Sequence, residues 1–134
     1  ARLCAGSDFP VEEADPRIGL QAAVTRTDEK GQPPGGFLPN ERLSLGEALR
    51  LFTVDAAYAA FAEDTIGQIR VGRRADLTML SGRLDSYLSG GPAPSDLRTR
   101  PVLLTIIDGQ TVFDRLGSAV PGKLNTATRP KRRG

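Results

Sequence analysis

Carboxylates near the beginning of the chain are the residues best suited to chemistry. Asp8 follows a short apolar run, and Glu12, Glu13 and Asp15 come soon after it. A carboxylate can accept a proton from an attacking water and return it to a leaving group, and it can also bind a divalent metal. Asp15 precedes Pro16, which is typical of a helix N-cap, whereas Glu12 and Glu13 could be solvated or could contact a substrate. Asp8 is the candidate catalytic residue, and the alternative is an aspartate with a structural role in a turn.

The lack of histidine limits the kinds of catalytic and metal site that this chain can form by itself. The 134 residues include no His, one Cys and one Met. Ser-His-Asp triads, Cys-His dyads and His-ligated metal sites are thus excluded within this chain. Ser7 has no His to take its proton, and Gly67 and Gly72 lack the Lys and Ser or Thr of a phosphate-binding loop. The lone Cys4 indicates a reducing, cytoplasmic setting, and we expect its side chain to be buried.

Basic residues gather at the C-terminal end of the chain. The formal net charge is +2, yet residues 116–134 carry five basic residues and no acidic one. A basic segment can contact nucleic acid or a membrane surface, but no aromatic side chains are interleaved here for base stacking. No run of apolar residues approaches the length of a transmembrane helix. We expect a solvated, disordered tail, and neither nucleic acid nor membrane as a partner.

The elements that would position Asp8 alternate between strand and helix. Residues 2–6 form a short apolar run that ends in Gly, which predicts a buried strand with Asp8 at its C-terminal end. Asp15 then begins a helix that extends to about residue 26. Strand, loop and helix form the repeating unit of a (β/α)₈ barrel, but 134 residues are too few for a complete barrel of about 250.

Further along, the periodicity changes from helix to strand. Residues 27–40 are rich in Gly and Pro and predict a surface loop. Ser44 and Glu47 have the spacing of a capping box, which predicts the start of a second helix, and Thr53 is a candidate cap for a third over residues 54–61. Alternation or apolar runs predict the later strands, at residues 66–72, 75–80, 102–107 and 110–113. Asp108-Gly109 joins the last two as a hairpin, and residues 89–96 predict a loop.

A set of motifs in this order resembles one known family. The motifs are Gly6-Ser7-Asp8-Phe9-Pro10-Val11-Glu12, Asp15-Pro16, Gly19-Leu20, Ala22-Ala23-Val24-Thr25-Arg26, Leu45-x-Glu47-Ala48-Leu49, Thr53, Ala56-Ala57-Tyr58, Ile66-Gly67-Gln68-Ile69, Gly72, Ala75-Asp76-Leu77 and the hairpin around Asp108-Gly109. Together they resemble the C-terminal part of amidohydrolase family 3, which consists of metal-dependent hydrolases. The resemblance covers residues 2–115.

This resemblance implies an α/β fold of which the chain holds only a part. Residues 1–63 would be the last strand and closing helices of a (β/α)₈ TIM-like barrel. Residues 64–115 would be the C-terminal strands of a small β-sandwich domain, and residues 116–134 the basic tail. We therefore expect the C-terminal fragment of a cytoplasmic enzyme, whose partner is an N-terminal barrel half that lies outside this sequence.

The resemblance also assigns roles to residues near Asp8. Asp8 matches the family's aspartate at the end of the last barrel strand, which helps to hold a divalent metal such as Zn²⁺ and moves a proton between water and leaving group. Phe9, Pro10 and Val11 would line the pocket for a small-molecule substrate. Asp76, in the Ala-Asp-Leu motif, would have a structural role at a turn.

The intact enzyme would hydrolyse C–N bonds other than peptide bonds, such as amides or carbamates. Without the other ligands, the isolated chain should bind no metal tightly and be inactive. The alternative is a noncatalytic module that folds alone or docks onto a separate N-terminal hydrolase partner. A third hypothesis, nucleic-acid binding through residues 131–133, predicts an affinity that is sensitive to salt.

Overall fold

The two longest helices of the described part begin with capping interactions, at the positions that the sequence predicts. In the computed structural model, which describes residues 1–88 and 94–117, Asp15 caps α1 (Pro16–Thr25) and accepts from the Arg17 backbone N–H at 3.0 Å. Ser44 caps α2 (Leu45–Phe52) and forms both halves of the capping box with Glu47. These contacts pair N–H groups that the first turn of a helix leaves free. Both helix predictions are confirmed.

A third helix follows α2 directly, and Thr53 occupies its N-cap position as predicted, but without a side-chain cap. α3 (Val54–Ala59) begins after Thr53, whose side chain makes no capping hydrogen bond to it. The Thr53 hydroxyl instead donates to the Leu49 carbonyl of α2 at 2.7 Å. The predicted loop over residues 27–40 is irregular up to a single 3₁₀ turn, η1 (Pro39–Glu41).

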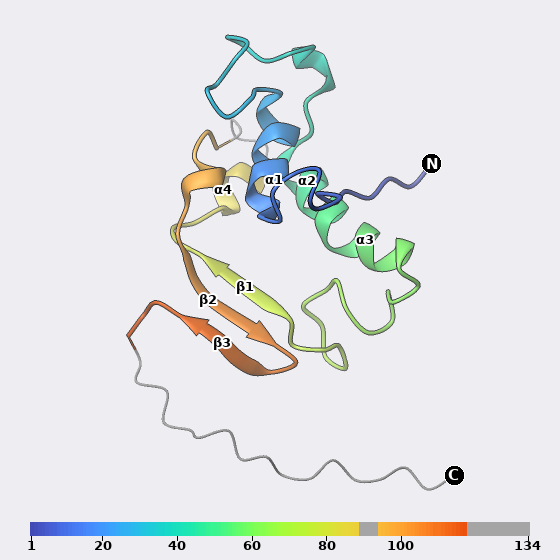
Figure 1. Ribbon diagram of the computed structural model, residues 1–134. Helices are drawn as coiled ribbons and strands as arrows, with labels where there is room; N and C mark the ends of the chain where they lie inside the picture. Colours follow the sequence, from blue (N-terminus) through green and yellow to red (C-terminus); the bar gives the residue numbers. More distant parts are fainter. Residues whose placement is uncertain (89–93, 118–134) are drawn as a thin grey trace, which may run out of the picture.

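The later strands form one antiparallel sheet in the order β1-β2-β3 (Figure 1). Its strands are β1 (Leu77–Leu80), β2 (Val102–Ile107) and β3 (Gln110–Asp114). The hairpin between β2 and β3 is confirmed, since Asp108 and Gly109 have φ values of 51° and 76°, as a two-residue turn with matching twist requires. The described part contains no second sheet that faces this one.

Two short helices connect β1 to β2. They are α4 (Asp85–Leu88) and η2 (Leu97–Thr99), which the sequence did not predict. Of the loop predicted over residues 89–96, residues 94–96 are irregular and residues 89–93 lie outside the described part. The predicted tail beyond residue 117 lies outside it as well. Among the described residues, no helix is long and apolar enough to cross a membrane.

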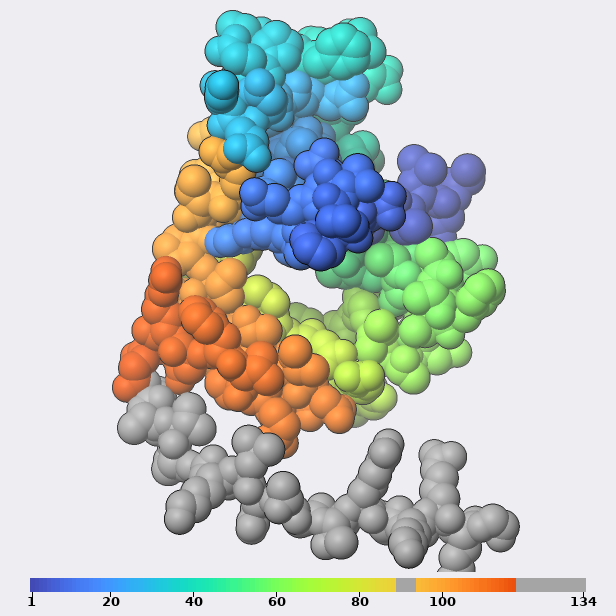
Figure 2. Space-filling model, in the orientation of Figure 1, coloured from blue at the N-terminus to red at the C-terminus, as the bar shows by residue number. Residues whose placement is uncertain are grey.

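The buried core lies between α1, α2 and η2. Leu20 and Val24 of α1 pack with Leu45 and Ala48 of α2 and with Leu97 of η2, and each is at most 6% exposed. Figure 1 shows α1, α2 and α4 grouped at one end of the sheet, and Figure 2 shows an opening between these helices and the strands. η2 therefore ties the chain that leads into β2 to the helices.

Two predicted strands are absent. Residues 2–6 and residues 66–72 have no strand structure, and Ile69 and Val71 are 89% and 102% exposed. A strand requires a neighbouring strand for its backbone hydrogen bonds, and no described strand lies beside either segment. The predicted burial of Cys4 is wrong for the same reason, because its side chain lies on this uncovered segment and is exposed.

Candidate functional site

Asp8 lies in a tight turn over residues 7–12, on the segment that leads to α1. Its φ is 49°, in the left-handed region that Asp adopts more readily than most residues. The Asp8 carbonyl accepts from the Val11 N–H at 2.9 Å, and the Ser7 carbonyl accepts from the Glu12 N–H at 3.2 Å. These two bonds close the turn and leave the Asp8 residue exposed. The carboxylate is thus available to groups from outside this turn.

The three residues predicted to line a substrate pocket form the tip of the same turn. Phe9 and Val11 are 70% and 74% exposed, and Pro10 is exposed between them. Two large apolar side chains therefore face solvent beside the Asp8 carboxylate. Such surface is costly in water and is the type that binds an apolar group. Substrate binding by Phe9, Pro10 and Val11 stays a prediction.

The described residues do not assemble a metal site by themselves. Within residues 1–88 and 94–117 there is no group of three or more His, Cys, Asp or Glu side chains that could hold an ion. A catalytic zinc ion needs three protein ligands and an open position. Asp8 therefore offers one carboxylate, and this part of the chain does not by itself fit a divalent metal.

The nearby acid Asp15 serves the fold. The hydrogen bonds from the Arg17 guanidinium lower the pKa of the Asp15 carboxyl, and burial opposes this only in part. The Arg17 guanidinium also donates to the carbonyl of Arg100, two residues before β2. Asp15 thus caps α1, as its pattern predicts, and it also orients the arginine that reaches the chain before β2.

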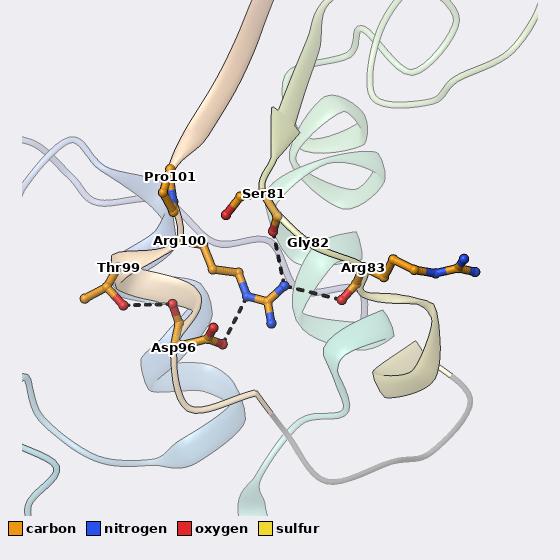
Figure 3. Close-up of a pocket in the computed structure, with 7 residues that line it drawn as sticks. All are labelled: Ser81, Gly82, Arg83, Asp96, Thr99, Arg100 and Pro101. Atoms are coloured by element: carbon orange, nitrogen blue, oxygen red, sulfur yellow. Dashed lines mark hydrogen bonds and ion pairs between the residues drawn. The ribbon is translucent and has the colours of Figure 1, made fainter. Parts of the chain in front are cut away.

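A cavity near the start of β2 is centred on Arg100 (Figure 3). The Arg100 guanidinium donates to the Asp96 carboxylate at 3.0 Å and to the carbonyls of Ser81 and Arg83, each at 3.3 Å. It also lies 5.7 Å from the centroid of the Tyr87 ring. The Arg100 Nε and Nη1 groups therefore donate to the protein itself, and they connect the residues before α4 with Asp96 after it.

A second cavity lies at the C-terminal end of α1, away from the Asp8 turn. The loop after α1 and the residues around η2 line it, and the Arg98 guanidinium bridges the two with a 3.0 Å ion pair to Glu29. Neither cavity includes Asp8 or the exposed residues beside it.

Asp76 has the structural role predicted for it. Its carboxylate accepts from the backbone N–H of Asp108 at 2.7 Å, and the Arg74 guanidinium lies within 3.5 Å of both acids. The Gly109 N–H donates to the Ala75 carbonyl at 3.0 Å. The residues before β1 therefore hold the tip of the β2-β3 hairpin.

Sequence reasoning missed a buried acid. Asp55 is only 8% exposed and pairs with Arg2 and Arg50. The available signal was that Asp55 is the one charged residue in the apolar stretch over residues 54–61. A single charge in such a stretch is rarely left without a partner.

Comparison with protein-family models identifies the family of the chain. Residues 1–113 match the model described as the amidohydrolase family, family 3. The chain belongs to amidohydrolase family 3. Its fold is accordingly the α/β fold of an amidohydrolase, of which the described residues contain helices and a small antiparallel sheet.

Three curated relatives share about a third of their aligned residues with this amidohydrolase chain. A putative amidohydrolase of Bacillus subtilis, YtcJ, is 36% identical over 114 residues, which cover 84% of this chain and 21% of the relative. The protein LONG AFTER FAR-RED 3 of Arabidopsis thaliana is 37% identical over 84% of this chain and 18% of its own length. The N-substituted formamide deformylase of Arthrobacter pascens is 32% identical over 87% of this chain and 20% of its own length.

The chain thus spans about a fifth of the length of these relatives. Among solved structures, an amidohydrolase from Thermotoga maritima MSB8 is 31% identical over 57% of this chain and 17% of that one, with a TM-score of 0.44.

Proposed function

We propose that this chain is the C-terminal part of a metal-dependent amidohydrolase that hydrolyses C–N bonds other than peptide bonds. In this enzyme Asp8 would transfer a proton from the attacking water to the leaving group. The observation that supports the proposal most strongly is the family match, which runs through the Asp8 turn and covers residues 1–113. The name of one relative, an N-substituted formamide deformylase, points to amide-like substrates. In this proposal residues 1–63 close a TIM-like barrel and residues 64–115 complete a small β-sandwich.

The chemistry of Asp8 and its exposure support this role. Its carboxylate projects from an exposed turn, so groups from another part of the protein can surround it. There it would accept a proton from the attacking water and return it to the departing nitrogen. Phe9 and Val11 would become buried against the substrate. Asp8 would be one ligand of a divalent ion such as Zn²⁺, whose chemistry when bound is to lower the pKa of a bound water, and the other ligands would come from outside this chain.

A direct test uses the purified chain with added Zn²⁺ and N-substituted formamide, amide and carbamate substrates. We expect no hydrolysis above the background, because the described residues offer no metal site. We also expect hydrolysis to appear when the chain is mixed with an Arthrobacter deformylase from which the segment that matches this chain has been removed. Metal-dependent turnover by the chain alone would contradict the proposal.

The alternative role is a noncatalytic module that docks onto a separate hydrolase partner. The large exposed apolar residues favour it, for example Phe61 at 95%. In the mixing experiment, a docking module would bind the truncated deformylase and restore its activity. It would do so even when Asp8 of this chain is replaced by Asn. If Asp8 is catalytic, the Asp8→Asn variant should still bind the truncated deformylase but should restore no activity.

A further inference from the structure

Asp55 on α3 is a buried carboxylate held by two arginines. Its Oδ1 lies 2.9 Å from Arg2 Nε and 3.4 Å from Arg50 Nη2, and the residue is 8% exposed. The Arg2 guanidinium also lies over the Tyr58 ring, 4.3 Å from its centroid. Removal of a carboxylate from water is costly unless cations and hydrogen-bond donors replace the water. Asp55 is therefore a strong anchor for the arginines that reach it.

The two arginines come from different parts of the chain. Arg50 lies on α2, directly before α3, so its contact with Asp55 joins two adjacent helices. Arg2 lies on the segment that leads to Asp8 and that forms no strand. The Arg2 contact is thus a tertiary attachment for a segment that no sheet holds in the described part.

A backbone hydrogen bond attaches the same segment a second time. The Ala5 N–H donates to the Leu51 carbonyl of α2 at 3.2 Å. Asp8 follows three residues later, a distance of at most about 10 Å of extended chain. The turn hydrogen bonds between Ser7 and Glu12 and between Asp8 and Val11 then fix the local backbone. Attachment at Arg2 and Ala5 therefore limits where the Asp8 carboxylate can lie.

We propose that Asp55 is a positioning residue for Asp8, which through Arg2 holds the Asp8 segment against α2 and α3. Asp55 lies on a different element from Asp8 and would not contact the substrate. The functional meaning of this inference rests on the proposed role of Asp8 as proton carrier. The attachment itself is a property of this chain and can be measured without turnover.

The test is amide hydrogen exchange in the full 134-residue chain, measured by NMR for the wild type and for Asp55→Asn. Asn keeps the size of the side chain but removes the charge that pairs with Arg2. We expect the Ala5, Val11 and Glu12 amides to exchange about tenfold faster in the variant, because the ion pair that attaches this segment to α3 has been weakened. The Ala48 and Ala57 amides, which report on α2 and α3, should accelerate by a smaller factor, because the Arg50 contact that the variant also weakens is the longer one, at 3.4 Å.

Matched variants separate positioning from helix packing. Asp64→Asn is the control, because Asp64 lies 3.8 Å from Arg73 and its side chain is 98% exposed; all five amide rates should stay unchanged. Asp55→Glu keeps a carboxylate for Arg2 and should restore slow exchange at Ala5. Arg2→Met should reproduce the effect of Asp55→Asn.

Two results would overturn the inference. Unchanged exchange at Ala5 and Val11 in Asp55→Asn would mean that Asp55 does not hold the Asp8 segment. Equal acceleration at Ala48 and Ala57 would mean that Asp55 only supports the packing of α2 and α3. Both results are independent of the hydrolysis assay, so they can be told apart from a failure of the proposed function.

Discussion

Replacement of Leu97 by Ala should destabilise the whole helical core, although Leu97 lies far from α1 in the sequence. Leu97 on η2 is 1% exposed and packs with Leu20, Val24 and Leu45. A buried Leu→Ala change costs about 2–5 kcal/mol of unfolding free energy, from lost burial and the cavity that remains. That is a large share of a typical total of about 5–15 kcal/mol. At about 4 °C per kcal/mol for a chain of this size, Tm should fall by roughly 8–20 °C.

Urea unfolding followed by far-UV circular dichroism measures this loss. The control is Leu3→Ala, because Leu3 is 69% exposed and the same truncation should change the unfolding free energy by less than about 0.5 kcal/mol. The urea midpoint of Leu97→Ala should fall with an unchanged slope, since both states expose similar surface. If Leu97→Ala loses no more stability than Leu3→Ala, then η2 is not part of a core shared with α1.

The remaining predictions concern the helix caps. Ser44→Ala should lower the unfolding free energy by about 1 kcal/mol, because it removes the acceptor for the Glu47 N–H, and urea unfolding at neutral pH measures it. For Asp15, the Arg17 guanidinium lowers the pKa of the carboxyl in the folded chain below its value in the unfolded chain. The resulting contribution to the free energy of unfolding is present above the unfolded-state pKa and is lost as the pH falls through the folded-state pKa. The stability advantage of the wild type over Asp15→Asn should therefore shrink from about pH 5 to about pH 2 in urea titrations, and a constant difference would contradict this.

The elements that the sequence predicted correctly are those with a complete local signal. The capping box at Ser44 and Glu47 and the Asp-Pro pair at the start of α1 each specify a helix start within a few residues. Asp108-Gly109 likewise specifies its own hairpin, because the turn and both strands are adjacent in the sequence. Such contacts form within the segment itself and need no distant partner.

The failures involve contacts with distant or unseen partners. Residues 2–6 and 66–72 have strand-like patterns, yet a strand forms only where another strand pairs with it. The burial of Asp55 depends on Arg2, whose contact with α3 no local pattern predicts. Asp8 was predicted to lie at the C-terminal end of a strand over residues 2–6, but that segment forms no strand and Asp8 lies exposed in a turn.

The central claim is that Asp8 serves an amidohydrolase active site, and a graft tests it most directly. Residues 1–113 would replace the matching segment of the Arthrobacter N-substituted formamide deformylase. kcat/KM would be measured for the graft, for its Asp8→Asn variant and for Glu12→Gln as the control. We predict that Asp8→Asn lowers kcat/KM by at least about 10²-fold, as expected for loss of a proton carrier, while Glu12→Gln stays near the parent graft. An active graft in which Asp8→Asn retains full activity would contradict the claim.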